Sequence, residues 1–285
     1  MKRLLALLLA TIALSAAPAR AELPGVDAIY QVLSDYLARR PSQGYTQQFD
    51  LKESLVVQRA FLAALEPELG RPVGYKVALV SRDMQERFNT TQPVRGVLLD
   101  KMLVPDNAEV PPRFGANLLL EADLIVVVKD KAINKATTQL QVLKHLSEAV
   151  AFIELPDSFI STNFPMDAAK LTAVNVGARL GVLGQRLPLK ANQKYLDALA
   201  GMRVTISDDT GATLGVAQGL SILDHPLNAV LWLIEDLKAS GQSLQPGDML
   251  SLGSLAMIRA PAGRTVTVRY EGLPGGKIQA SVRFK

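Results

Sequence analysis

The sequence predicts an α+β fold, and three observations support that class. Helical periodicity occupies the first part of the chain, from Pro24 to about Leu69. Short strand-like segments, broken by Gly, Pro and Asn, follow after Gly70. A few amphipathic helices interrupt these strands, and no linker-like segment divides them. We therefore expect a helical N-terminal region over residues 22–70 and one β-rich domain over residues 71–285.

Each predicted element follows from its own pattern. In the N-terminal region Ile29, Val32, Leu33 and Tyr36 recur at i, i+3, i+4 and i+7, and residues 55–65 are similarly amphipathic. The strands are predicted at residues 73–80, 94–99, 118–128, 150–154, 203–206, 249–252, 265–270 and 278–284. The later helices are predicted at residues 138–146, 192–199 and 226–238.

The first 21 residues have the pattern of a cleavable secretory signal. Met1-Lys2-Arg3 precedes an apolar run to Ala17 that is short for a membrane span, and Ala19-Arg20-Ala21 resembles a cleavage site. We expect cleavage after Ala21 and a periplasmic or secreted protein. Removing this segment leaves 264 of the 285 residues and takes away three basic side chains, so the formal charge falls from +4 to +1.

Composition excludes several kinds of chemistry and partner. The chain has no cysteine, so thiolate nucleophiles and thiolate metal sites are excluded. Only His145 and His225 could supply imidazole, so a metal here should be a hard cation bound by oxygen. Neither a cluster of Lys and Arg nor a basic tail survives removal of the signal, so we expect no nucleic-acid partner and no membrane association.

Glu121 and Asp123 are the most informative residues, because they lie within the apolar run at 118–128. In a strand, the side-chain period of two places both carboxylates on one face, about 7 Å apart. Burial and mutual repulsion would penalise both charges unless a cation compensates them. A bound divalent cation is one explanation. The other is a strand end that faces water, and the spacing alone does not decide between them.

Four further polar residues stand within or beside predicted elements. Lys76 lies inside the first predicted strand, either as a proton carrier near carboxylates or as an edge lysine whose amine reaches water. Glu154 closes another apolar run, as a third oxygen ligand or as a strand-end acid or helix cap. Asp248 fits a Pro-Gly-Asp turn, and His225 before Pro226 fits a helix start.

Several segments in this order resemble one known family. They are Gly74-Tyr75-Lys76-Val77-Ala78-Leu79-Val80-Ser81, Gln92-Pro93-Val94-Arg95-Gly96-Val97-Leu98, Glu121-Ala122-Asp123, Ile153-Glu154-Leu155-Pro156-Asp157-Ser158, His225-Pro226-Leu227-Asn228-Ala229-Val230, Leu244-Gln245-Pro246-Gly247-Asp248-Met249-Leu250 and Val266-Thr267-Val268-Arg269-Tyr270. Together they resemble the 2-keto-4-pentenoate hydratase and 4-oxalocrotonate decarboxylase branch of the fumarylacetoacetate hydrolase superfamily. The resemblance covers essentially the whole mature chain.

The resemblance implies a mixed β-roll behind a helical N-terminal region and a homo-oligomeric lyase. It also implies an Mg²⁺ or Mn²⁺ cofactor, whose ligands fall on Glu121, Asp123 and Glu154, with Asp123 in place of the usual second Glu. The family's active-site lysine falls on Lys76. In such enzymes the metal chelates a small 2-oxo or 2-hydroxydienoic acid, and the lysine moves protons during hydration or decarboxylation.

The chain also departs from the family pattern. Hydratases usually have an acid where this chain has Val94, whereas decarboxylases have an apolar residue there. The family's Ala-Asp-Asn-Ala segment is Ala173-Val174-Asn175-Val176 here, a Ser/Thr-Gly segment is Leu252-Gly253, and Phe159 replaces a frequent Arg. Two alternatives to a lyase therefore remain: a catalytically impaired periplasmic binding protein for an acidic metabolite, and a C–C hydrolase of the same superfamily.

Overall fold

The computed structural model describes residues 23–111 and 113–285. The predicted signal at residues 1–21 lies outside the described residues. The helices are α1 (Val26–Leu37), α2 (Leu51–Leu69), α3 (Arg82–Arg87), α4 (Gln139–Lys144), α5 (Ala168–Ala173), α6 (Gln193–Gly201) and α7 (Pro226–Ala239). None of these helices is long and apolar enough to cross a membrane.

The strands form two mixed sheets. They are β1 (Pro72–Ala78), β2 (Val94–Leu99), β3 (Leu103–Pro105), β4 (Ala108–Val110), β5 (Leu119–Val128), β6 (Leu146–Leu155), β7 (Leu180–Pro188), β8 (Arg203–Asp208), β9 (Thr213–Gln218), β10 (Met249–Ser251), β11 (Ala256–Arg259), β12 (Thr265–Glu271) and β13 (Ile278–Phe284). The 8-stranded sheet has the order β2-β1-β10-β5-β6-β7-β3, with β11 also paired to β5, and the 5-stranded sheet has the order β4-β13-β12-β8-β9.

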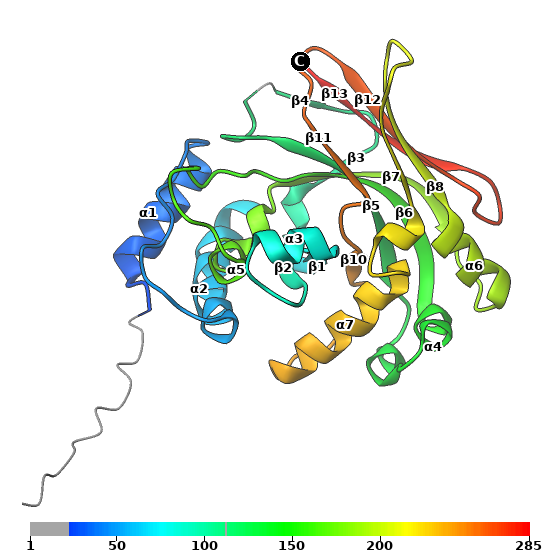
Figure 1. Cartoon of the computed structure of the whole chain (residues 1–285), viewed down its shortest axis with the longest axis horizontal. Helices are drawn as coiled ribbons and strands as arrows, with labels where there is room; N and C mark the ends of the chain where they lie inside the picture. The colour runs from blue at the N-terminus through cyan, green and yellow to red at the C-terminus, as the bar shows by residue number, and fades with distance from the viewer. Residues whose placement is uncertain (1–22, 112) are drawn as a thin grey trace, which may run out of the picture.

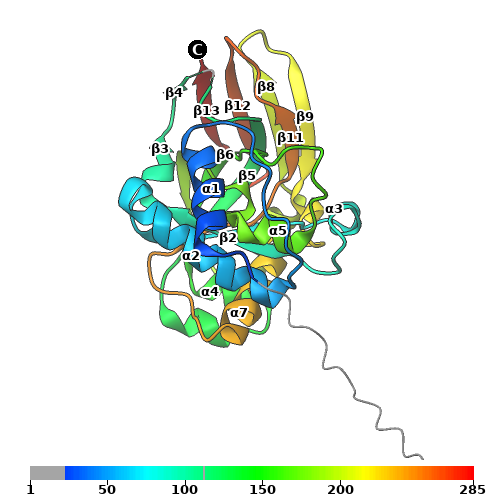
Figure 2. The ribbon, with the colours of Figure 1, turned by 90° about the vertical axis from the view of Figure 1, so that its left-hand side faces the viewer.

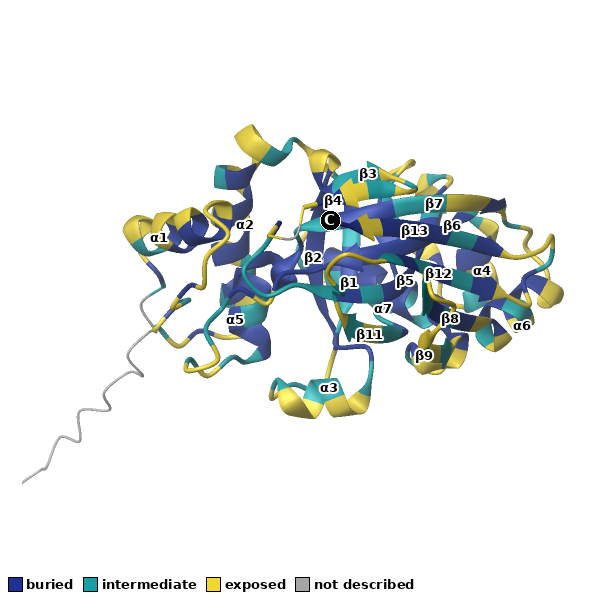
Figure 3. Cartoon of the chain, turned by 90° about the horizontal axis from the view of Figure 1, so that it is seen from above, coloured by how far each residue is buried: buried dark blue, intermediate teal, exposed yellow. Residues whose placement is uncertain are grey.

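Helices cover the large sheet from two sides. Figure 1 places α4, α6 and α7 together on one side, and Figure 2 shows α1, α2 and α5 grouped at the other. Viewed from above, the central strands are mostly buried, whereas much of α1 and α3 is exposed (Figure 3). The predicted α+β class and mixed β-roll are confirmed.

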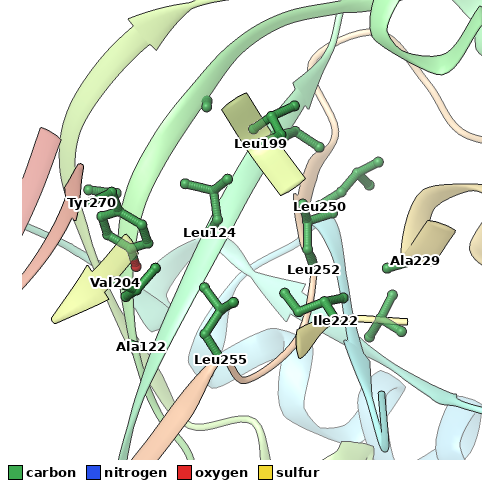
Figure 4. Close-up of a cluster of buried hydrophobic side chains, with 14 of the residues drawn as sticks. Ala122, Leu124, Leu199, Val204, Ile222, Ala229, Leu250, Leu252, Leu255 and Tyr270 are labelled. Atoms are coloured by element: carbon green, nitrogen blue, oxygen red, sulfur yellow. The ribbon is translucent and has the colours of Figure 1, made fainter. Parts of the chain in front are cut away.

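The main core lies between the two sheets and continues under α4, α6 and α7. Figure 4 shows its centre, where Leu124 of β5, Leu199 of α6 and Leu250 of β10 meet, and all three side chains are fully buried. Tyr270 of β12 also lies here, and its hydroxyl donates toward the backbone carbonyls of Asp123 and Phe152. This contact ties the small sheet to β5 and β6.

The predicted N-terminal region folds as two helices that share a second core with the rest of the chain. Helix α2 begins with a capping box formed by Asp50 and Glu53 and ends at Gly70, whose φ of 80° permits the turn. Phe61 and Leu65 of α2 pack with Ala173 of α5. Residues 23–70 are therefore packed onto the sheet rather than set apart from it.

Several elements were not predicted. Helices α3 and α5 and strands β3, β4, β7, β9 and β11 were missed. Strand β6 begins at Leu146 rather than at Val150, inside the segment predicted to end the preceding helix. The other expected helices and strands appear, with ends that differ by one or two residues. Asp248 accepts a hydrogen bond from the backbone of Gln245, as expected of a turn, and His225 caps α7.

Candidate active site

The predicted site residues lie together on one face of the large sheet. Glu121 of β5 is directly opposite Glu154 of β6 in the antiparallel register, and Asp123 follows two residues along β5. Lys76 is on β1, which is separated from β5 only by the short strand β10. Three of these four side chains are buried, with exposed fractions of 3% for Lys76, 0% for Asp123 and 2% for Glu154.

Lys76 forms an ion pair with Glu154. Its Nζ lies 2.5 Å from Oε1 of Glu154 and donates a hydrogen bond of 3.2 Å to the carbonyl oxygen of Val176. Burial would lower the pKa of Lys76, but attraction to Glu154, Glu121 and Asp123 outweighs burial and raises this pKa. In the metal-free site the lysine is therefore held as an ammonium ion.

Asp123 is held by donors from the β10–β11 segment. Its carboxylate accepts hydrogen bonds from the Ser251 hydroxyl and from the backbone N–H groups of Leu252 and Gly253. Burial, followed by repulsion from Glu154, raises the pKa of Asp123 to about 7, although the bond from Ser251 opposes the rise. These contacts fix the carboxylate in one orientation.

Glu121 has less support than Asp123. Burial and repulsion from Glu154 raise the pKa of Glu121 to about 8, and attraction to Lys76 only partly opposes the rise. The cluster thus contains three carboxylates and one positively charged group, the amine of Lys76. This excess of negative charge is unfavourable without a further cation.

The three predicted metal ligands do not form a ready-made cage. In the described part of the chain, no three acidic or histidine side chains converge closely enough to hold an ion as they stand. The physical reason is that Asp123 is directed at the donors near Ser251, while Glu154 is directed at Lys76.

The donor set nevertheless fits a hard divalent cation. All three groups are carboxylates, which Mg²⁺ and Mn²⁺ prefer. Apart from the ion pair with Lys76, Oε1 of Glu154 is buried and accepts no hydrogen bond from the residues that the structure describes. The raised pKa values of Glu121 and Asp123 indicate the same missing positive charge.

A left-handed segment positions the lysine. Asn175, Val176 and Gly177 have φ angles of 55°, 54° and 64°, and a β-branched residue rarely adopts this conformation. The Asn175 side chain accepts from the N–H of Val97 at 2.7 Å and donates to its carbonyl at 2.9 Å. These two bonds fasten the segment to β2, so that the carbonyl of Val176 points at Nζ of Lys76.

Gly96 leaves the space that the lysine occupies. It pairs with Lys76 across β1 and β2, and a Cβ at Gly96 would lie 2.9 Å from Cγ of Lys76 and 3.0 Å from the carbonyl oxygen of Asn175. Our sequence reasoning assigned no role to Gly96, Asn175 or Ser251. Gly96 and Asn175 lie within segments that resemble the family, and this resemblance is the one sequence signal that could have identified them. Ser251 lies outside those segments, so no sequence signal pointed to it.

The chain is similar to known proteins over most of its length. The chain is 30% identical over 212 residues to 2-keto-4-pentenoate hydratase of Paraburkholderia phymatum, which covers 74% of this chain and 78% of that protein. It is 26% identical over 254 residues to 4-oxalocrotonate decarboxylase of Pseudomonas putida, covering 89% and 90%. No family model matches the chain.

A solved structure supports the fold. The 4-oxalocrotonate decarboxylase of Pseudomonas putida, complexed with magnesium and adipate, superposes with a TM-score of 0.80 at 23% identity and covers 91% of this chain and 96% of that chain. The similarity in fold therefore extends over most of the chain.

Proposed function

The chain belongs to the 2-keto-4-pentenoate hydratase and 4-oxalocrotonate decarboxylase branch of the fumarylacetoacetate hydrolase superfamily, and from this premise we propose its chemistry in detail. It is a lyase of 2-oxo acid metabolism that depends on a divalent metal. In our proposal Glu121, Asp123 and Glu154 bind Mg²⁺ or Mn²⁺, and Lys76 moves protons on a small 2-oxo or 2-hydroxydienoic acid.

The observation that carries this proposal is the cluster of three carboxylates around one lysine. Two of the carboxyl groups have pKa values raised to about 7 and about 8, because burial and mutual repulsion disfavour their charges. A solvent-facing strand end would not produce such shifts. The magnesium bound by the related decarboxylase supports a metal as the compensating charge.

Each residue has a distinct task. A divalent cation held here would supply Lewis-acid polarisation of the substrate's 2-oxo group. Nζ of Lys76, oriented by the carbonyl of Val176, is the group that gives and takes protons. Once a cation shares the charge of Glu154, the attraction that raises the pKa of Lys76 weakens, and the lysine can release a proton more readily.

The surroundings of the lysine favour decarboxylation over hydration. Val94, at the position where the hydratases carry an acid, is 3% exposed and packs with Leu79, Ala168 and Val176. An apolar cluster cannot activate a water molecule as a carboxylate does. Loss of CO₂ needs no added water, so it suits this environment.

Titration calorimetry with Mg²⁺ and Mn²⁺ tests the ligands. We expect wild-type protein to bind one ion per chain, Glu121→Ala to lose most of this affinity, and the control Glu148→Ala, on β6 beside Arg186, to retain it. Equal binding by Glu121→Ala would contradict the assignment.

Ultraviolet absorbance then follows turnover of 2-hydroxypenta-2,4-dienoate and 2-oxohex-3-enedioate. Turnover of the second substrate alone would support decarboxylation. A metal-loaded protein that converts neither substrate would contradict the proposed lyase chemistry.

We also propose that the protein is exported and forms a homo-oligomer. The apolar leader after Lys2 and Arg3 supports export. N-terminal sequencing of protein from the periplasmic fraction should start at Glu22, and light scattering after gel filtration should give a multiple of the mature mass. An unprocessed N-terminus or a monomer would contradict the respective proposal.

A further inference from the structure

A small cavity lies where the segment after α1 meets the segment before α5. It has a volume of about 10 Å³, which is room for a single water-sized particle. Its lining includes Gln43, Tyr45, Ile160, Pro165 and Lys170, and none of its lining residues is acidic. Gln43 and Pro165 are exposed, so the rim of the cavity borders solvent.

Lys170 is a buried cation without an acidic partner. In the described part of the chain, the buried lysine and arginine side chains are Lys76, Arg95 and Lys170. The first two each form an ion pair with an acid, whereas no described carboxylate oxygen lies within 4.0 Å of Nζ of Lys170. This Nζ donates one long hydrogen bond, of 3.4 Å, to the carbonyl of Pro165. Since an ammonium group has three N–H donors, most of its hydrogen-bonding capacity is unused.

The acid nearest along the chain does not neutralise Lys170. Asp167 is the N-cap of α5, and its carboxylate accepts a hydrogen bond of 2.8 Å from the backbone N–H of Lys170 rather than from its amine. A buried charge without a counter-ion is unfavourable. The surroundings of this lysine therefore lack a negative charge.

Tyr45 supplies a second group without a partner. Its side chain is 2% exposed, and its hydroxyl is buried and has no hydrogen-bond partner among the described residues. Such groups are normally paired, because an unpaired buried hydroxyl is costly. A water molecule in the cavity could accept from Tyr45 and Lys170 but would leave the positive charge uncompensated. An anion there would accept from both and compensate the charge.

The walls of the cavity are fixed by backbone contacts. The N–H of Ser42 donates to the carbonyl of Phe159, and the N–H of Ser161 donates to the carbonyl of Ser42, both at 2.8 Å. Gly44 has a φ of 66°, and a Cβ there would lie 3.3 Å from the side chain of Ile160. These contacts hold residues 42–44 against residues 159–161, so the cavity is formed before any ion binds.

We propose that this cavity binds a monatomic anion of the size of chloride, with Lys170 as its counter-ion and the hydroxyl of Tyr45 as a hydrogen-bond donor. The cavity is too small for a substrate carboxylate, a sulfate or a phosphate, so its occupant is distinct from the ligands of the carboxylate cluster. The bound anion stabilises the folded protein, because it compensates a buried charge and joins the segment after α1 to α5. This role is independent of the proposed function.

Thermal unfolding in sodium chloride and in sodium gluconate at equal ionic strength tests this inference, because gluconate is too large for the cavity. Wild-type Tm should rise by about 3–6 °C at a chloride concentration ten times Kd. Bromide should act like chloride. Lys170→Met should show no response, since it has no charge to compensate. Tyr45→Phe should need about tenfold more chloride for the same rise, because it lacks one hydrogen bond to the anion.

A matched control and a crystal experiment complete the test. Lys194→Met removes the same charge from an exposed lysine of α6 and should respond to chloride as wild type does. Crystals grown in sodium bromide should show an anomalous peak within hydrogen-bond distance of Nζ of Lys170. Equal wild-type Tm in the two salts, a full response in Lys170→Met, or a cavity without a bromide peak would each overturn the inference. If Lys170→Met does not fold, Tyr45→Phe and the bromide crystals still decide the matter.

Discussion

The two faces of β5 differ in what they contribute. On one face Ala122, Leu124 and Val126 are fully buried in the main core. On the other face Glu121 and Asp123 have raised pKa values, because their charges are removed from water without enough positive charge nearby. The first face stabilises the fold through apolar burial, whereas the second reduces stability and carries the residues to which we assign the chemistry. Substitutions on the apolar face should therefore lower the free energy of unfolding, whereas substitutions on the polar face should lower activity or metal affinity.

Lys76→Met should have the largest effect of these tests. It removes the proposed proton carrier while retaining much of the side-chain volume, so kcat should fall by about 10²–10⁴-fold. Steady-state kinetics with saturating Mg²⁺ measures this loss. Lys194→Met is the control, because Lys194 is an exposed lysine of α6, outside the carboxylate cluster. Retained activity in Lys76→Met would remove the lysine from the mechanism.

Leu124→Ala tests the apolar face. It leaves a cavity in the main core, so the free energy of unfolding should fall by about 2–5 kcal/mol, measured by urea denaturation. The affinity for Mg²⁺ should change little in the folded protein. A loss of metal affinity with unchanged stability would contradict the division between the two faces.

The polar face makes the metal-free protein sensitive to pH. The folded-state pKa values of about 8 for Glu121 and about 7 for Asp123 lie above those of exposed carboxyl groups. Protonation of these two carboxyl groups therefore stabilises the folded state. This stabilisation is complete at pH values below the ordinary pKa of a carboxyl group, and it is lost as pH rises through 7 and 8. In EDTA, Tm should fall between pH 5 and pH 8.5, and Mg²⁺ should restore it at the higher pH.

Glu121→Gln separates this effect from other titrations, because its amide does not ionise. Its Tm in EDTA should fall less steeply with pH than that of wild type, and Glu148→Gln should follow wild type. If Tm of the metal-free protein rises or stays constant over this range, repulsion on the polar face is not what limits its stability.

Gly96→Ala should have the smallest effect of the series. The added methyl group would press on Cγ of Lys76 and on the carbonyl of Asn175, so kcat should fall by about tenfold while the fold persists. Gly201→Ala is the control, because nothing lies within 4 Å of a Cβ at that position. Full activity in Gly96→Ala would show that the lysine tolerates displacement.

The clustering of the site residues could be predicted from the sequence, because it depends on local periodicity and on the order of segments along the chain. The period of two within 118–128 places Glu121 and Asp123 on one face, and the structure agrees. Lys76 and Glu154 stood out as polar residues in or at the end of predicted strands, the resemblance assigned their roles, and β1 and β6 do bring them to that face. The ligand roles of the three carboxylates remain a prediction.

The contacts that orient these residues could not be predicted, since they depend on tertiary structure. The left-handed conformation of Val176 opposes the preference of a β-branched residue and exists because Asn175 is fastened to Val97. Likewise Asp123 receives its hydrogen bonds from Ser251 to Gly253, 128 to 130 residues later in the chain. Neither contact leaves a periodic pattern in the sequence.

The hydroxyl of Tyr270 has a consequence for engineering. It reaches from β12 to the backbone carbonyls of Asp123 and Phe152, directly behind the polar face. The backbone of β5 at Asp123 is therefore held from the rear by a different sheet. Transplanting the carboxylates and the lysine onto a scaffold that contains only the larger sheet would omit this support, so a working graft must carry β12 as well.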